Sequence, residues 1–250
     1  MFRLDGKTAL VTGASSGLGR RFATVLAAAG ARVAIAARRT ERLADLEREI
    51  KAAGGTAFAV AMDVTDVKSI VDGVSAAEAG LGPIDILVNN SGVAVDKRLG
   101  RFTEADYDKV MDTNLKGAFF VAQEVGQRMI DAKRPGSIIN IASTAGLRPF
   151  TTLGVYGMSK AGLIYMTRAM ASDWARRDIS VNAMCPGYIT TELNADHWQT
   201  DAGKKLISML PRQRVGKEED LDGLLLLLAS DAARMINGAI IPIDDGYSAG

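Results

Sequence analysis

The sequence predicts an α/β fold in which a doubly wound, parallel sheet carries helices on both faces. Three observations predict it. Short apolar runs alternate with helical patterns along all 250 residues. The apolar runs are continuous rather than alternating, as is typical of strands buried in a parallel sheet. A glycine-rich turn separates the first run from the first helical pattern. The alternation implies right-handed crossovers within a single domain that spans residues 1–250.

Seven segments are expected to form the strands: residues 8–12, 32–37, 56–62, 84–88, 137–142, 179–184 and 239–243. Between them, the periodicity predicts helices up to residue 29 and over residues 40–53, 103–132 and 155–177. Gly30 and the pair Gly54-Gly55 end the first two of these helices. The apolar run 224–228 is too short to span a bilayer and predicts a buried helix.

Composition excludes several classes of function. The formal net charge is +1, so no strong field would attract nucleic acid or an anionic membrane. Residues 1–7 lack the apolar stretch of a secretory signal, and a cytoplasmic protein is expected. Cys185 is the only cysteine, which excludes an internal disulfide, and His197 is the only histidine. We therefore expect no metal site and no Ser-His-Asp triad, with His197 an ordinary surface or lid residue.

The turn after the first strand has the sequence Thr12-Gly13-Ala14-Ser15-Ser16-Gly17-Leu18-Gly19. In this position Gly13 permits a tight turn, Gly17 lets the backbone approach a pyrophosphate, and Gly19 allows close packing of helix and sheet. The amides at the start of the helix favour phosphates. Placed between a strand and a helix, the motif predicts a Rossmann-type dinucleotide site rather than a plain turn. Its expected ligands are Gly13, Ser15, Ser16, Gly17, Leu18 and Gly19.

The end of the second strand indicates which dinucleotide is bound. NAD sites usually have an acidic residue there, which binds the ribose hydroxyls. This chain has Ala36-Ala37-Arg38-Arg39 instead. Two guanidiniums suit a 2′-phosphate, and no carboxylate repels it. NADP(H) is therefore predicted over NAD(H), although NAD(H) stays possible.

Tyr156 and Lys160 are four residues apart, which places a phenol and an ammonium on one helix face. A tyrosine normally titrates near 10, and a neighbouring cation lowers its pKa. The pair therefore predicts a proton-transfer group, but the pattern is weak without its context.

These features together resemble the short-chain dehydrogenases/reductases, in their single-domain branch of about 250 residues. Further family motifs stand at Asp63-Val64, Asn89-Asn90-Ser91-Gly92, Asn114, Ser143 and Pro186-Gly187. The chain departs from the family pattern twice. Ser91 replaces an alanine, which the backbone should tolerate. Asp245 replaces a glycine, which adds a charge and removes a residue that tolerates positive φ.

The resemblance implies roles for individual residues. Tyr156 would give or take the proton, and Ser143 would bind the carbonyl oxygen. Lys160 would bind the nicotinamide ribose and, with the positive charge of the oxidised ring, lower the tyrosine pKa. Asn114 would hold a water that relays protons from Lys160. Cofactor contacts are implied for Asp63, Val64, Asn90, Tyr156, Lys160, Pro186, Gly187, Ile189 and Thr191.

Residues 188–210 are expected to form a lid over the substrate. The side chains expected in the substrate pocket are Ser143, Leu147, Phe150, Tyr156, Tyr188, Leu193 and Trp198. They are mainly apolar, and no cluster of arginines is present to anchor a di-acid.

The predicted function is reduction of a carbonyl, with a 3-oxoacyl thioester as one candidate substrate. Alternatives are small ketones, sugars and steroid-like alcohols, or a catalytically silent cofactor-binding regulator. The resemblance also implies a homo-oligomer, a dimer or tetramer, paired through the two long helices. Ala118, Ala122, Ala161 and Ala169 are expected on their outer faces.

Overall fold

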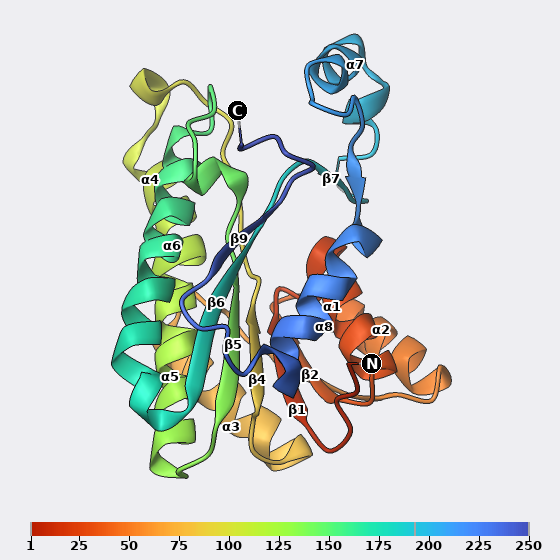
Figure 1. Ribbon diagram of the computed structural model, residues 1–250, viewed down its shortest axis with the longest axis vertical. Helices are drawn as coiled ribbons and strands as arrows, with labels where there is room; N and C mark the ends of the chain where they lie inside the picture. The colour runs from red at the N-terminus through yellow and green to blue at the C-terminus, as the bar shows by residue number, and fades with distance from the viewer. Residues whose placement is uncertain (1, 193, 250) are drawn as a thin grey trace.

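The computed structural model describes residues 2–192 and 194–249. A seven-stranded sheet with the order β3-β2-β1-β4-β5-β6-β9 lies at its centre (Figure 1). Its strands are β1 (Thr8–Thr12), β2 (Arg32–Ala37), β3 (Thr56–Ala61), β4 (Ile86–Asn89), β5 (Gly136–Ile141), β6 (Ile179–Pro186) and β9 (Ile240–Ile243). Every neighbouring pair is parallel. The predicted fold class is confirmed, and each predicted strand is present to within two residues at either end.

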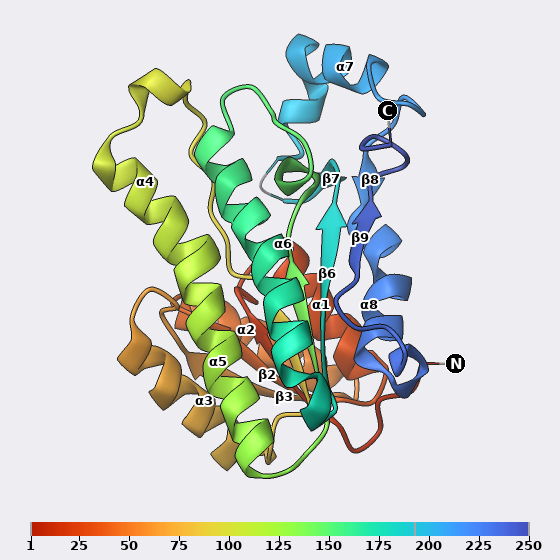
Figure 2. The same ribbon diagram turned by 60° about the vertical axis from the view of Figure 1, so that its left-hand side comes forward.

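Helices cover both faces of the sheet (Figures 1 and 2). One face carries α1 (Gly17–Ala28), α2 (Thr40–Ala52) and α8 (Asp222–Ala229). The other carries α3 (Val67–Leu81), α5 (Ala118–Asp131) and α6 (Gly154–Trp174). Side chains alternate between the two cores: Val11 of β1 packs with α1 and α2, whereas Leu10 packs with α3 and α5. Because both faces are covered, all five residues of β1 are buried, which explains its continuous apolar run.

The predicted helix over residues 103–132 consists of three parts. It begins with α4 (Glu104–Met111), continues through one π-helical stretch (Asp112–Gly117) and ends with α5. Thr103 caps α4: its hydroxyl accepts a bond from the backbone N–H of Asp106, and the Asp106 carboxylate accepts one from the backbone N–H of Thr103. π-helical turns are uncommon and are frequent at functional sites.

The faces expected to pair with a second copy differ from the prediction in part. Ala118 and Ala122 are buried in the chain's own core, so they pack on its sheet. Ala161 and Ala169 are exposed on α6, and Tyr165 between them is 73% exposed. Only the α6 alanines therefore lie on an outer face.

Between β6 and α8 the chain leaves the sheet and forms elements that were not predicted. These are β7 (Ile189–Thr190), α7 (Asp201–Ser208) and β8 (Gly216–Lys217), with β7 and β8 paired in parallel. In Figure 2, α7 lies at the top of the molecule, beyond the carboxyl ends of β6 and β9. Among the described residues, no helix is both long and apolar enough to cross a membrane.

Gly117 provides a test of how the π-helical stretch packs on the sheet. A Cβ at this position would lie 2.5 Å from the carbonyl oxygen of Val64, which is backbone and cannot turn away. We expect Gly117→Ala to lower the free energy of unfolding by about 1–3 kcal/mol in urea melts. Gly100→Ala is the matched control, because no atom lies within 4 Å of the Cβ it would add. Equal stability of the two variants would contradict this account of the packing.

Candidate active site

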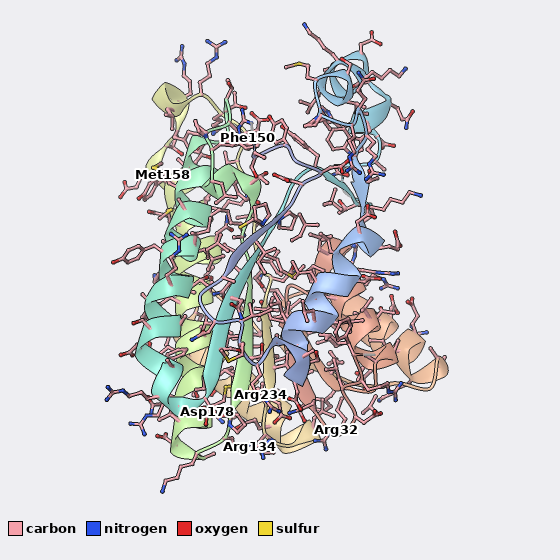
Figure 3. The ribbon with its side chains drawn as sticks, viewed as in Figure 1. Arg32, Arg134, Phe150, Met158, Asp178 and Arg234 are labelled. Carbon is pink, nitrogen blue, oxygen red and sulfur yellow. The ribbon has the colours of Figure 1, made fainter. Side chains whose placement is uncertain are left out.

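A cleft of about 730 Å³ opens at the carboxyl ends of the strands. It lies where the strand order reverses, between β1 and β4, which is where open α/β sheets bind their ligands. Figure 3 shows Phe150 at this end of the molecule, with Arg32 and Arg134 at the opposite end. The lining includes most of the residues predicted from the sequence: Gly13, Ser15, Ser16, Gly17, Leu18, Gly19, Arg38, Arg39, Asp63, Val64, Asn90, Ser143, Phe150, Tyr156, Lys160, Pro186, Gly187, Tyr188, Ile189, Thr191 and Trp198.

The glycine-rich turn has the backbone conformation that its sequence predicts. Gly13 and Gly17 have φ values of +67° and +51°, which other residues rarely adopt. A Cβ on Gly19 would lie 2.3 Å from the carbonyl oxygen of Gly13, so no larger residue fits there. Helix α1 begins at Gly17, and the side chain of its N-cap residue, Ser16, accepts no capping bond. The first amides of α1 are therefore available to an anion in the cleft.

Both predicted arginines are at the mouth of the cleft. Arg39 donates hydrogen bonds to the hydroxyls of Ser15, at 2.9 Å, and Ser16, at 2.7 Å. Arg38 is 68% exposed, and its nearest acidic partner, Asp63, is 4.0 Å away. Two guanidiniums thus border the glycine-rich turn, where a phosphate on the adenosine ribose would need them.

The predicted proton-transfer residues converge from two elements. Helix α6 carries Tyr156 and Lys160, and Ser143 follows β5. The Lys160 ammonium donates a 2.8 Å hydrogen bond to the carbonyl oxygen of Ile141 and lies 5.6 Å from the centroid of the Tyr156 ring. The Ser143 hydroxyl accepts a 3.1 Å bond from the N–H of Ala145, which holds it at the end of the strand.

The buried environment of Tyr156 acts against the lowered pKa that was predicted for its phenol. Burial raises the pKa of its phenol, and the hydrogen bond with Ser143 opposes that rise only in part. Burial has the opposite effect on a cation and lowers the pKa of Lys160 to about 8. Desolvation thus opposes the lowering that Lys160 and the oxidised nicotinamide ring are predicted to cause, and that lowering stays a prediction.

Asn114 lies in the π-helical stretch and does not line the cleft. Its Oδ1 accepts a 2.8 Å bond from the N–H of Val93, and its Nδ2 donates to the carbonyl oxygen of Val93, at 2.8 Å, and to Ser159 Oγ, at 3.0 Å. Ser159 in turn donates a 2.7 Å bond to the carbonyl oxygen of Tyr156. By these contacts Asn114 positions the turn that carries Tyr156. Asn114 Oδ1 and Lys160 Nζ are both near Gly92: each lies 3.5 Å from the position that a Cβ on Gly92 would take. The proton relay from Lys160 through a water held by Asn114 stays a prediction.

Of the seven residues predicted for the substrate pocket, five line the cleft. Leu147 is 41% exposed and does not line the cleft, because it follows the 3₁₀ turn Thr144–Gly146, which directs it outward. Leu193 lies outside the described residues. Sequence reasoning missed Leu153 and Asn194 in the lining and Tyr247 behind it. No motif marks these three, because tertiary packing alone brings them to the site.

Comparisons with known proteins identify the family. The family model described as short chain dehydrogenase matches residues 7–202. A gluconate 5-dehydrogenase of Gluconobacter oxydans is 38% identical, over 99% of this chain and 97% of its own length. A 3-oxoacyl-acyl-carrier-protein reductase of Thermotoga maritima is also 38% identical, over 98% of both chains. The chain belongs to the short-chain dehydrogenase family.

A solved structure shows the same fold for a member of the family. The gluconate 5-dehydrogenase of Burkholderia cenocepacia, in complex with NADP and tartrate, is 36% identical. It matches with a TM-score of 0.95, over 100% of this chain and 98% of that one. This short-chain dehydrogenase is thus an oxidoreductase that acts on alcohol and carbonyl groups.

The buried lysine of this short-chain dehydrogenase predicts a pH-dependent stability. Lys160 titrates at about 8 when folded, and an unfolded lysine titrates near 10.4. Between these values the unfolded chain binds more protons, so the free energy of unfolding rises with pH. In cofactor-free protein we expect wild type to gain roughly 2 kcal/mol relative to Lys160→Met between about pH 7.5 and pH 9.5. Parallel pH profiles of the two proteins in urea melts would contradict the lowered pKa.

Proposed function

We propose that this protein reduces a carbonyl group to a secondary alcohol with NADPH, with Tyr156 as the proton donor, and catalyses the reverse reaction with NADP⁺. One observation carries the proposal: Tyr156, Ser143 and Lys160 face the same cleft as the glycine-rich turn. A phenol, a hydroxyl and an ammonium beside a dinucleotide site are the groups needed for proton transfer coupled to hydride transfer.

The cleft residues suit NADP(H). The amides of α1 and the space kept by Gly19 suit a pyrophosphate, and Arg38 and Arg39 suit a 2′-phosphate. Two relatives of 36% and 38% identity were crystallised with NADP. When bound, the cofactor supplies or accepts the hydride.

The chain's own residues handle the proton. Ser143 Oγ would donate a hydrogen bond to the carbonyl oxygen and stabilise the charge that develops on it. The Tyr156 O–H bond would then break, and its proton would pass to that oxygen as the alcohol forms. Because burial raises the pKa of Tyr156, the phenol is protonated at neutral pH and ready to donate. The phenolate left behind would be stabilised by the charge of Lys160.

The catalytically silent alternative has less support. A cofactor-binding regulator would use the glycine-rich turn and Lys160, but it has no need of the Ser143 hydroxyl. That hydroxyl is bonded to the Tyr156 phenol in the same cleft, as proton transfer to a carbonyl would require. We propose that residues 188–210 form a lid over the reacting groups, since β7 and Trp198 line the cleft. We also propose that copies of the chain pair through α5 and α6, where Phe119, Met158 and Tyr165 are exposed.

Tyr156→Phe tests the proton donor. We expect kcat for NADPH-dependent ketone reduction to fall by about 10³-fold or more, because the ring stays but its only transferable proton is lost. The Kd for NADPH, measured by fluorescence titration, should stay within about threefold. Tyr107→Phe is the matched control, since this phenol lies on α4, is 43% exposed and does not line the cleft. Retention of more than about a tenth of wild-type activity by Tyr156→Phe would refute the donor role.

Arg38→Ala tests the cofactor preference. Among residues 2–192 and 194–249, Arg38 makes one ion pair, at 4.0 Å from Asp63, so its removal should weaken mainly the binding of the 2′-phosphate. We expect kcat/KM for NADPH to fall about tenfold or more while that for NADH barely changes. Arg48→Ala is the control, because this arginine lies on α2 and pairs only with Asp45. A wild-type preference for NADH would overturn the assignment.

A further inference from the structure

Three aromatic side chains from separate segments form one side of the cleft. We call Phe150, Tyr188 and Trp198 the aromatic wall; all three line the cleft beside Tyr156. The ring centroids of Phe150 and Tyr188 are 5.9 Å apart, and those of Tyr188 and Trp198 are 5.8 Å apart. The rings meet edge to face, at 66° and 85°. This is a favourable arrangement for aromatic pairs, so the rings of the wall stabilise one another.

Tyr247, near the C-terminus, supports the wall from behind. It does not line the cleft, but its ring lies 5.8 Å from Phe150 and 5.5 Å from Tyr188. Tyr188 and Tyr247 also share a side-chain hydrogen bond. The Arg148 guanidinium lies 4.7 Å from the centroid of the Tyr247 ring and donates a 2.8 Å bond to its carbonyl oxygen. The wall thus depends on a residue far away in the sequence.

Asn194, the polar side chain bonded to Trp198 of the wall, is already engaged by the chain itself. Asn194 Oδ1 accepts bonds from the N–H of Thr191, at 2.8 Å, and from the Trp198 indole, at 3.2 Å, and its Nδ2 donates to the carbonyl oxygen of Ile189. Among the described lining residues, the cations are Arg38 and Arg39 at the glycine-rich turn and Lys160, which is buried and bonded to Ile141. A substrate carboxylate beside the wall would meet neither a guanidinium nor an ammonium from this lining.

We propose that the aromatic wall selects neutral ketones that carry a ring, and that Tyr247 is a positioning residue for this specificity. The inference rests on the proposed carbonyl reduction and names its substrate class. A ring packs against aromatic faces and edges with a geometry that an open chain does not match. A sugar acid would lose water from its hydroxyls and carboxylate without new partners on this side of the cleft.

Three ketones of related structure test the substrate class: 4-phenylbutan-2-one, 4-(3-oxobutyl)benzoate, which adds a carboxylate to the same ring, and octan-2-one, which has no ring. With NADPH and wild-type protein, we expect kcat/KM for the phenyl ketone to exceed each of the others by about tenfold. Higher kcat/KM for the carboxylate, for 5-ketogluconate or for octan-2-one would overturn the inference. If the protein reduced only the carboxylate, 5-ketogluconate or octan-2-one, the proposed carbonyl reduction would still hold and only the substrate class would be wrong. If it consumed no NADPH with any carbonyl compound, both the proposed function and the substrate class would be refuted.

Tyr247→Ala tests the positioning role. We expect KM for 4-phenylbutan-2-one to rise about five- to tenfold while kcat stays within about threefold, because ring packing is weakened but the proton donor is untouched. Octan-2-one kinetics should change little, so the preference between the two ketones narrows. Tyr247→Phe, which keeps the ring, should restore the preference. If Tyr247→Ala melts early, Tyr247→Leu fills the space without a flat ring and should show the same loss. An unchanged preference in folded Tyr247→Ala or Tyr247→Leu would refute the role.

Discussion

The hydroxyl of Thr12 joins the two halves of the sheet at the floor of the cleft. This buried oxygen accepts bonds from the N–H groups of Asn90, at 3.0 Å, and Ser91, at 3.1 Å. The Asn90 side chain returns a 2.9 Å bond to the carbonyl oxygen of Thr12. These contacts fasten the end of β1 to the end of β4, where the strand order reverses. The glycine-rich turn starts from this junction, and a Cβ on Gly13 would lie only 3.0 Å from the Ser91 Cα. The start of the glycine-rich turn is therefore held in place, and Ser91 contributes to this through its backbone.

The reacting end is fixed by a second set of buried bonds. Asn114 connects the segment after β4, at Val93, to Ser159 on α6. Lys160, the next residue of α6, is bonded to the last residue of β5. Helix α6 is thus held to the sheet beside Tyr156 from two directions. Buried polar bonds of this kind are strong and specific when every partner is satisfied, so the phenol is positioned before any substrate arrives.

The sequence predicted the fold and most of the site because those features have local signals. Parallel strands that are buried on both faces appear in the sequence as continuous apolar runs. The glycine-rich turn is recognised by its glycine spacing and by its position between the first strand and the first helix. The π-helical stretch at Asn114 was not predicted, and the close approach of Gly117 to Val64 within it is seen only in the tertiary fold. The burial that raises the pKa of Tyr156 was not predicted, because spacing reveals the neighbouring cation but not the depth at which the phenol lies. Tyr247 was missed because its partners, Phe150 and Tyr188, reach it only through the tertiary fold.

Asp245 shows how one departure from the family pattern is accommodated. Its φ of +59° belongs to the left-handed region, which costs a residue other than glycine roughly 1–2 kcal/mol. Its carboxylate accepts a 2.7 Å bond from Arg214 and lies 3.3 Å from Arg212. The bond with Arg214 lowers the pKa of Asp245, so the carboxylate stays charged at neutral pH. Both arginines belong to the segment that leads from α7 to β8, residues 209–215. Tyr247 follows Asp245 by two residues. The C-terminal segment therefore makes two sets of contacts: Asp245 binds the segment between α7 and β8 through its charge, and Tyr247 packs against the aromatic wall through its ring. The left-handed backbone at Asp245 lies between these two contacts in the sequence.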